Sequence, residues 1–370
     1  MSLADHIADL SLVDHHVHGA FKGRLDRTAF EQLITESDRP VPPWLSTFDS
    51  QLGLAIRRYC APLLGLQPHA SPDDYLAARA QQDPNTLLLN AAGVSDYLVD
   101  TGYQADAVTG VDELAALSGS RAHEVVRLES ELEYVAAHES TVAAVPHALL
   151  QRLEERTAGA VGLKSIVAYR HGFDFDPAEP STREVLAALD RWYSAGADRV
   201  TDPVLLRWLL WIGARRGLPL QLHVGFGDTD LNLRTADPLL LTEWLRQVEP
   251  LGTQVALLHC YPFHREVGYL AHVFPHVYFD LGLTTMYVGA RAAAVIAEGL
   301  ELAPFGKLLY SSDAFGPAEL HYLGAVLWRR AVTSVLGGFV EQDDWSAEDA
   351  VRVATLWGRD NARRLYRLPS

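Results

Sequence analysis

Two histidines, one residue apart, end an apolar run near the N-terminus. Residues 10–19 read Leu-Ser-Leu-Val-Asp-His-His-Val-His-Gly, a pattern typical of a β-strand that places His16 and His18 at its end. Alternate residues of a strand point to one face, about 7 Å apart at ~3.3 Å per residue. One metal ion can bridge two imidazoles at that separation, since zinc binds each nitrogen at ~2.0–2.1 Å. Alone, the pair fits a half-buried strand with two polar residues equally well, so ligands on other strands must decide.

Residues that bind metals or catalyse reactions also mark four later apolar runs. His223 and His259 lie at the ends of two runs, Asp313 follows Leu-Leu-Tyr-Ser-Ser, and Lys164 lies inside Val-Gly-Leu-Lys-Ser-Ile-Val. A histidine that ends a strand is commonly a hydrogen-bonded core residue, and an aspartate there often caps the next helix. Lys164 is harder to explain in this way, because burying an unpaired ammonium is costly. Together these nitrogen and oxygen donors predict a site for zinc or a neighbouring first-row metal.

Eight apolar runs, separated by segments of helical periodicity, must position these residues. Such alternation predicts βαβ units and a parallel sheet, and buried strands of near-continuous apolar character favour a (β/α)8 TIM barrel. Catalytic groups of this fold lie at the C-terminal ends of the strands, where all the candidates are expected. The expected strands are 10–17, 95–100, 124–129, 160–167, 219–224, 254–259, 277–282 and 307–312. Helical segments between them include 183–195, 201–215, 237–248 and 317–335.

Two segments exceed a minimal barrel. Residues 21–92 hold several helical stretches and proline-rich turns, which we interpret as a helical insertion after the first strand, over the barrel mouth or at a subunit interface. Ser346-Ala-Glu-Asp349 resembles a capping box that opens a final helix reaching about Leu365. We therefore predict one domain over 1–370, with a helical insertion at about 21–92 and a C-terminal helix.

Composition limits the class of protein. The 370 residues are 48% hydrophobic and 21% charged, which suits a soluble protein with a large core. With 31 basic and 47 acidic residues the net charge is −16, which argues against nucleic acid and anionic membranes as partners. No secretory signal pattern or transmembrane run is visible, and Cys60 and Cys260 are isolated thiols, so we expect a cytoplasmic protein. A small-molecule substrate and a homo-oligomer are both compatible with this composition.

The motifs resemble those of the amidohydrolase superfamily. The resemblance rests on Asp14-x-His16-x-His18, on Lys164 within strand four, and on His223, His259 and Asp313 on strands five, six and eight. A closer resemblance, to the nodulin/FluG-like branch of the amidohydrolase-related (amidohydrolase 2) family, covers most of the chain except 21–90. Its motifs are GLKSIVAYR at 162–170, HVGFGDTD at 223–230, LHCYP at 258–262, EVGYL at 266–270 and NARRLY at 361–366.

The resemblance implies a metal-dependent hydrolase of amide, lactone or ester bonds. Its metal ligands would be His16, His18, Lys164, His223, His259 and Asp313. Two divalent ions, zinc or else manganese or iron, would be bridged by a carbamate on Lys164. A metal-bound hydroxide would attack the substrate, and Asp313 would shuttle the proton.

Two other interpretations use the same residues. One is a mononuclear-zinc, non-oxidative decarboxylase of a small aromatic or unsaturated acid. Its ligands would be His16, His18, His223 and Asp313, His259 would be a catalytic acid, base or electrophile, and Lys164 would stay an amine. A metal-binding domain without turnover is the other; it is disfavoured because a structural site needs only four ligands.

Substrate contacts are expected from loops that follow strands three to five. Arg170, beside Tyr169, could bind a carboxylate with its planar guanidinium, and Asp228 could hold an ammonium or amide group near Arg234. Glu129 is expected at the end of strand three. An arginine and an aspartate above the metal would suit an amino-acid-like, carboxylate-bearing substrate, although each residue could equally form an ordinary salt bridge.

Overall fold

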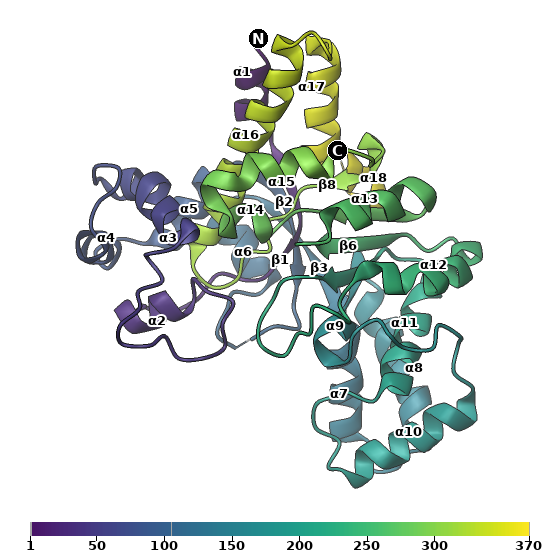
Figure 1. Ribbon diagram of the computed structural model, residues 1–370. Helices are drawn as coiled ribbons and strands as arrows, with labels where there is room; N and C mark the ends of the chain where they lie inside the picture. The colour runs from purple at the N-terminus through teal and green to yellow at the C-terminus, as the bar shows by residue number, and fades with distance from the viewer. Residues whose placement is uncertain (1, 105, 370) are drawn as a thin grey trace.

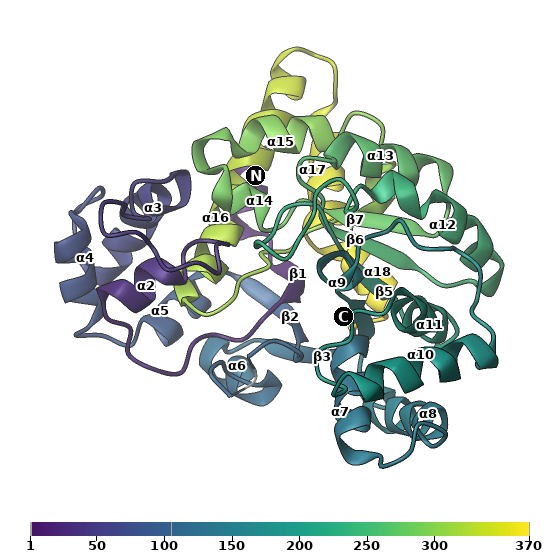
Figure 2. The ribbon, with the colours of Figure 1, turned by 60° about the horizontal axis from the view of Figure 1, so that its bottom comes forward.

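Eight parallel strands in sequential order form the centre of the protein (Figures 1 and 2). The computed structural model describes residues 2–104 and 106–369. Backbone hydrogen bonds close the sheet between β1 and the chain after β8, from His15 N to Tyr310 O (3.1 Å) and from His18 N to Ala314 O (2.8 Å). The predicted (β/α)8 barrel is therefore confirmed. Its strands are β1 Leu12–Val17, β2 Val94–Asp100, β3 Arg121–Arg127, β4 Gly162–Ser165, β5 Leu220–Val224, β6 Val255–His259, β7 Val277–Asp280 and β8 Leu308–Leu309.

Helices cover the outside of the barrel and bury its apolar surface. Three expected strands differ at both ends from the observed ones, because the chain leaves the strand conformation at Leu128 and Ile166 to form helices and because β8 ends at Leu309. The other five differ at one end, by one or two residues. The helices outside the insertion are α1 Leu3–Asp9, α6 Val111–Ser118, α7 Leu128–His138, α8 Val145–Thr157, α9 Val167–Arg170, α10 Thr182–Ser194, α11 Pro203–Ala214, α12 Thr242–Val248, α13 His264–Val273, α14 Thr284–Tyr287, α15 Ala292–Gly299, α16 Ala318–Glu341, α17 Ala347–Thr355 and α18 Asn361–Tyr366.

The segment between β1 and β2 is helical, as predicted, and lies on one flank of the barrel (Figure 1). Its aromatic residues belong to the main apolar core, where Phe30 stacks on Phe48 with ring centroids 5.6 Å apart. Tyr75 donates a 2.8 Å hydrogen bond to Glu319 of α16, which fixes the segment to the barrel. Its residues 32–38 reach the mouth, where most of them line the central cavity. The helices of this insertion are α2 Arg27–Gln32, α3 Gln51–Ala55, α4 Pro72–Arg79 and α5 Pro84–Ala91.

The last helix closes the bottom of the barrel. Ser346 Oγ accepts a hydrogen bond from Asp349 N, as a helix N-cap does, and a short π-helical turn separates α17 from α18. Tyr366, at the end of α18, packs with the inward-facing Val13 and Leu258. The C-terminal helix therefore contributes directly to the barrel interior.

Helix α16 is long and apolar enough, by length and composition, to cross a membrane. It packs against α1, α5 and α15, and 44% of its most apolar window is buried inside the protein. Glu319 and His321, both polar, are buried along it. These features are those of a core helix, which passes the same test.

Candidate metal centre

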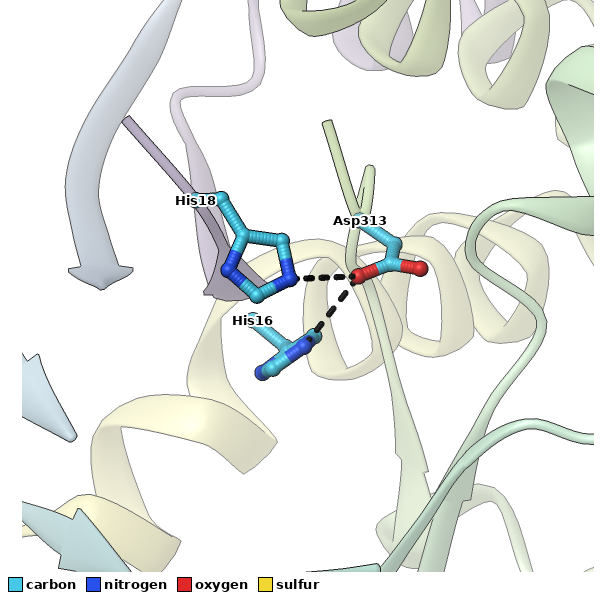
Figure 3. A group of neighbouring side chains, drawn as sticks. All are labelled: His16, His18 and Asp313. Carbon is cyan, nitrogen blue, oxygen red and sulfur yellow. Dashed lines mark ion pairs between the residues drawn. The ribbon is translucent and has the colours of Figure 1, made fainter. Parts of the chain in front are cut away.

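His16, His18 and Asp313 bring one ligand atom each to a common point at the C-terminal end of the barrel (Figure 3). Asp313 Oδ1 lies 3.1 Å from His16 Nε2 and 3.6 Å from His18 Nε2. All three ligand atoms fall within 4.8 Å of one another, and the three residues are buried. The same-face projection predicted for the two histidines of the first strand thus produces a candidate three-donor metal site.

Asp313 is held in place by its backbone and left unsatisfied at its carboxylate. Its N–H donates to His16 O (3.1 Å), and its φ of +51° lies in the left-handed region that non-glycine residues rarely adopt. Although two ring nitrogens are close, Oδ1 has no hydrogen-bond partner within residues 2–104 and 106–369. Burial raises the pKa of Asp313 to about 7. A divalent cation would supply the missing partner of this buried oxygen.

Burial keeps the histidines of the centre neutral. It lowers the pKa of His18 to about 4 and the pKa values of His16, His223 and His259 far below the ordinary value. The nearby Lys164 ammonium lowers the pKa of His16 further. A neutral imidazole is the form that donates a lone pair to a metal, so the donor set fits a first-row divalent ion.

Gln221 fixes the orientation of His16. The Gln221 Nε2 group donates to His15 O (2.7 Å) and to Tyr366 Oη (2.9 Å), which identifies Oε1 as the acceptor. That oxygen lies 2.8 Å from His16 Nδ1, so this ring nitrogen carries the proton. His16 Nε2 is left with its lone pair and faces Asp313, as metal-binding histidines require.

His18 and His259 are oriented in related ways. His18 Nδ1 lies 3.3 Å from the carbonyl oxygen of Asp100, which leaves Nε2 free for a metal. The backbone N–H of His259 donates to Asp280 Oδ1 (3.0 Å), and His15 Nε2 bonds the other oxygen of Asp280 at 2.9 Å. His259 Nε2 then lies 3.3 Å from Asp313 Oδ2, on the side of the carboxylate away from the three-donor site.

Lys164 and His223 complete the predicted group of six. Lys164 Nζ lies 3.5 Å from His16 Nε2, and burial lowers the pKa of the amine to about 8. The His223 ring lies 4.7 Å from that of His259, and its Nε2 donates to Phe226 O at 3.1 Å. All six predicted residues therefore line one cavity, and His16, His18 and Asp313 already converge on one point.

The cavity above the ligands has a volume of about 500 Å3. Three residues predicted to bind substrate, Arg170, Tyr169 and Asp228, belong to its wall. Arg170 Nη1 lies 3.1 Å from Glu133 Oε1, yet Nη1 and Nε make no aligned hydrogen bond with a described residue. The guanidinium can therefore donate a further hydrogen bond to a ligand in the cavity.

Two residues predicted to bind substrate lie elsewhere. Glu129 is buried in the first turn of α7 rather than on a strand, and its Oε1 accepts from Ser165 Oγ (2.6 Å) and Ile166 N (3.0 Å), so it supports the end of β4. Arg234 is exposed in a turn beyond β5 and is not among the residues that line the cavity. Proximity to a strand end in the sequence predicts both residues at the cavity. The turns that follow the strands point their side chains elsewhere.

Three further charged residues line the cavity. Arg127, which the sequence places two residues before Glu129 on strand three, has its Nη2 atom 2.6 Å from Asp100 Oδ2. Arg199 and, from the insertion, Glu36 were not predicted from the sequence. Gln221 carried a usable signal, because a polar residue two positions before His223 shares its face of a strand. Glu36 carried none, since its loop reaches the cavity only through tertiary packing.

The model of the amidohydrolase family matches residues 134–368. The chain belongs to this family. The resemblance predicted from the ligand motifs is thereby confirmed, and membership supports a metal-dependent enzyme that acts on small molecules.

Individual relatives agree with this assignment. The amidohydrolase is 34% identical over 223 residues to protein fluG of Emericella nidulans; the match covers 56% of this chain and 26% of fluG. A Lactobacillus casei protein assigned as a metal-dependent hydrolase superposes with a TM-score of 0.86 at 28% identity, over 99% of this chain and 97% of its own. Uronate isomerase of Thermotoga maritima shares the fold, with a TM-score of 0.64 at 14% identity over 98% and 96% of the two chains.

Proposed function

We propose that this amidohydrolase hydrolyses an amide, lactone or ester bond of a small, carboxylate-bearing substrate with the help of bound divalent metal. The observation that carries the proposal is the convergence of neutral imidazoles on the buried, unsatisfied carboxylate of Asp313, next to a buried lysine. Zinc is the metal expected from these donors, with manganese or iron as alternatives.

The residues divide into two groups of ligands. His16, His18 and Asp313 would hold one ion, and a second ion would lie towards His223 and His259, with Lys164 between the two groups. Such ions, when bound, activate water near neutral pH and polarise a carbonyl. Binding two such ions requires several nitrogen and oxygen donors close together, and the innermost wall of the cavity consists of such donors.

Asp313 is the proposed proton carrier. The carboxylate would accept a proton from the attacking water, and the acid would return it to the leaving group. Burial, which raises the pKa of Asp313 to about 7, favours this proton uptake, and a bound cation acts in the opposite direction. His259 Nε2, 3.3 Å from Asp313 Oδ2, is placed to hydrogen-bond that carboxylate or to share in metal binding. Arg170 would bind the carboxylate of the substrate and so orient the scissile bond.

Lys164 favours a two-metal centre. With a pKa of about 8, part of the amine is unprotonated at neutral pH, and this form adds to carbon dioxide to give a carbamate and a released proton. The carbamate carries two anionic oxygens in place of one cation. Carbamylation would therefore remove the cost of a buried ammonium beside His16 and supply a bridging ligand.

A single-metal decarboxylase is the second candidate. It is favoured by the three-donor convergence at His16, His18 and Asp313, to which His223 would add a fourth ligand. In that mechanism Lys164 stays an amine and His259 acts as acid, base or electrophile.

Metal content and product analysis separate the two candidates. The hydrolase predicts near two metal equivalents, uptake of one oxygen atom from 18O-labelled water into product, and loss of about one equivalent in Lys164→Ala. One equivalent in both proteins, with carbon dioxide released from an aromatic or unsaturated acid, would overturn it in favour of the lyase. Asp228→Ala, which changes the wall and none of the ligands, is the control and should keep the metal content of the wild type.

A further inference from the structure

One carboxyl group of the cavity wall comes from the insertion. Glu36 lies on the segment after α2 and lines the cavity with Tyr103 and Tyr169. Its Oε1 atom is buried and makes no aligned hydrogen bond with a described residue. The hydroxyl of Tyr287 lies close enough to act on this carboxyl as a hydrogen-bond donor. A buried carboxylate with this one neighbouring hydroxyl can take a further donor from a ligand.

The charge around Glu36 restricts the ligand to a cation. Burial raises the pKa of Glu36 to about 8, and the negative charges of Asp313 and Asp228 act in the same direction. A metal ion bound at Asp313 would offset part of this negative potential, and the part due to Asp228 would remain. An anionic group would be repelled from this wall, whereas a cationic amine would be attracted and would favour the ionised form of Glu36.

The positive charges of the cavity lie on another side. Arg127 ends β3 and Arg170 follows β4, whereas Glu36 faces Tyr287, which follows β7. In a sequential eight-stranded barrel, strands three and four lie across from strands seven and eight. The cavity is thus bipolar, with Arg127 and Arg170 on one wall and Glu36 beside Tyr287 on the other. Tyrosine rings and hydroxyls are additional favourable neighbours for an ammonium.

We propose that Glu36 binds a cationic amine of the substrate and so determines specificity for molecules that carry an amine on one arm and a carboxylate on the other. This inference rests on the proposed function, because it takes the bond to be hydrolysed to lie between the arginine wall and the Glu36 wall of the cavity. Glu36 acts in it as an acceptor for the amine, and Tyr287 as a second hydrogen-bonding group.

Calorimetric binding to the zinc-loaded protein tests the proposal without turnover. The probes are ω-amino acids from 4-aminobutanoate to 8-aminooctanoate, each paired with the straight-chain alkanoate in which a methyl group replaces the ammonium, so that neither compound has a bond to hydrolyse. We expect at least one amino acid to bind about tenfold or more tightly than its alkanoate, since hydrogen bonds to charged groups contribute that much. Glu36→Gln, which is nearly isosteric, should abolish this preference and leave the affinity for the alkanoate within about twofold.

Asp38→Asn is the matched control. It removes the same charge from the same loop, but Asp38 is exposed and already accepts from Thr229 Oγ1 at 2.7 Å. The preference should persist in this variant and weaken in Tyr287→Phe. Equal binding of the paired compounds, absence of binding by the whole series, or an unchanged preference in Glu36→Gln would each overturn the proposal. Because the assay measures neither metal content nor oxygen uptake, its failure is distinguishable from failure of the proposed hydrolase.

Discussion

Replacing Gln221 with leucine tests how the protein orients its first metal ligand. The Gln221 amide nitrogen donates hydrogen bonds to His15 O (2.7 Å) and Tyr366 Oη (2.9 Å). Its oxygen therefore accepts a hydrogen bond from His16 Nδ1. Leucine fills a similar volume without an acceptor, and the imidazole would then adopt either tautomer. Loss of such an outer partner typically lowers metal affinity about 10- to 100-fold. This corresponds to about 1.4–2.7 kcal/mol of binding free energy.

Zinc affinity, measured by competition with a chromophoric chelator, gives the readout. Tyr366→Phe is the control, because it removes the hydroxyl on the far side of Gln221 and keeps the contact with His16. Its zinc affinity should fall by less than that of Gln221→Leu. Circular dichroism should report a folded barrel for both variants. A zinc affinity of Gln221→Leu within about twofold of the wild type would refute the role assigned to this amide.

Three further predictions concern separate parts of the protein. Mass spectrometry of the intact protein in bicarbonate buffer with zinc should show Lys164 carrying one added carbon dioxide, absent in Lys164→Met; an unmodified chain would contradict the carbamate. Arg170→Ala should lower kcat/KM more than about a hundredfold for a carboxylate substrate, as expected for a lost charge-assisted pair, and an uncharged analogue should lose far less. Both ring nitrogens of His321 are buried without a hydrogen-bond partner among the described residues, and burial lowers the pKa of this histidine to about 3. The unfolded chain therefore binds a proton between about pH 3 and 6.5 that the folded one does not, so stability falls as pH falls through this range. His321→Leu should reduce that loss in urea unfolding at pH 4.5 relative to pH 7.5; an identical difference between the two pH values in both proteins would contradict this explanation.

The arrangement of the ligands was predictable because a barrel brings the C-terminal ends of all its strands to one mouth. His16, His223 and His259 lie on β1, β5 and β6, so knowledge of the fold was enough to group them. Asp313 follows a strand of only two residues, and its apolar neighbours still marked the position. The sequence pattern thus predicted both the barrel fold and the residues that make up the candidate centre.

The cavity wall was less predictable, because loops have no periodicity that fixes where their side chains point. Arg234 was expected near the substrate and lies exposed, whereas Glu129 turned inward to support β4. Glu36 reaches the mouth only because the insertion packs on α16 through Tyr75 and Glu319. Specificity therefore depends on tertiary contacts that no local pattern records.

Anomalous scattering at the zinc absorption edge, from crystals grown with zinc and bicarbonate, tests the central claim most directly. The account predicts a peak about 2.0–2.2 Å from His16 Nε2, His18 Nε2 and one oxygen of Asp313, the ordinary lengths for zinc bound to nitrogen and oxygen. A second peak beside an extended Lys164 side chain would support the two-metal hydrolase. No peak within bonding distance of these three residues at saturating zinc would contradict the account.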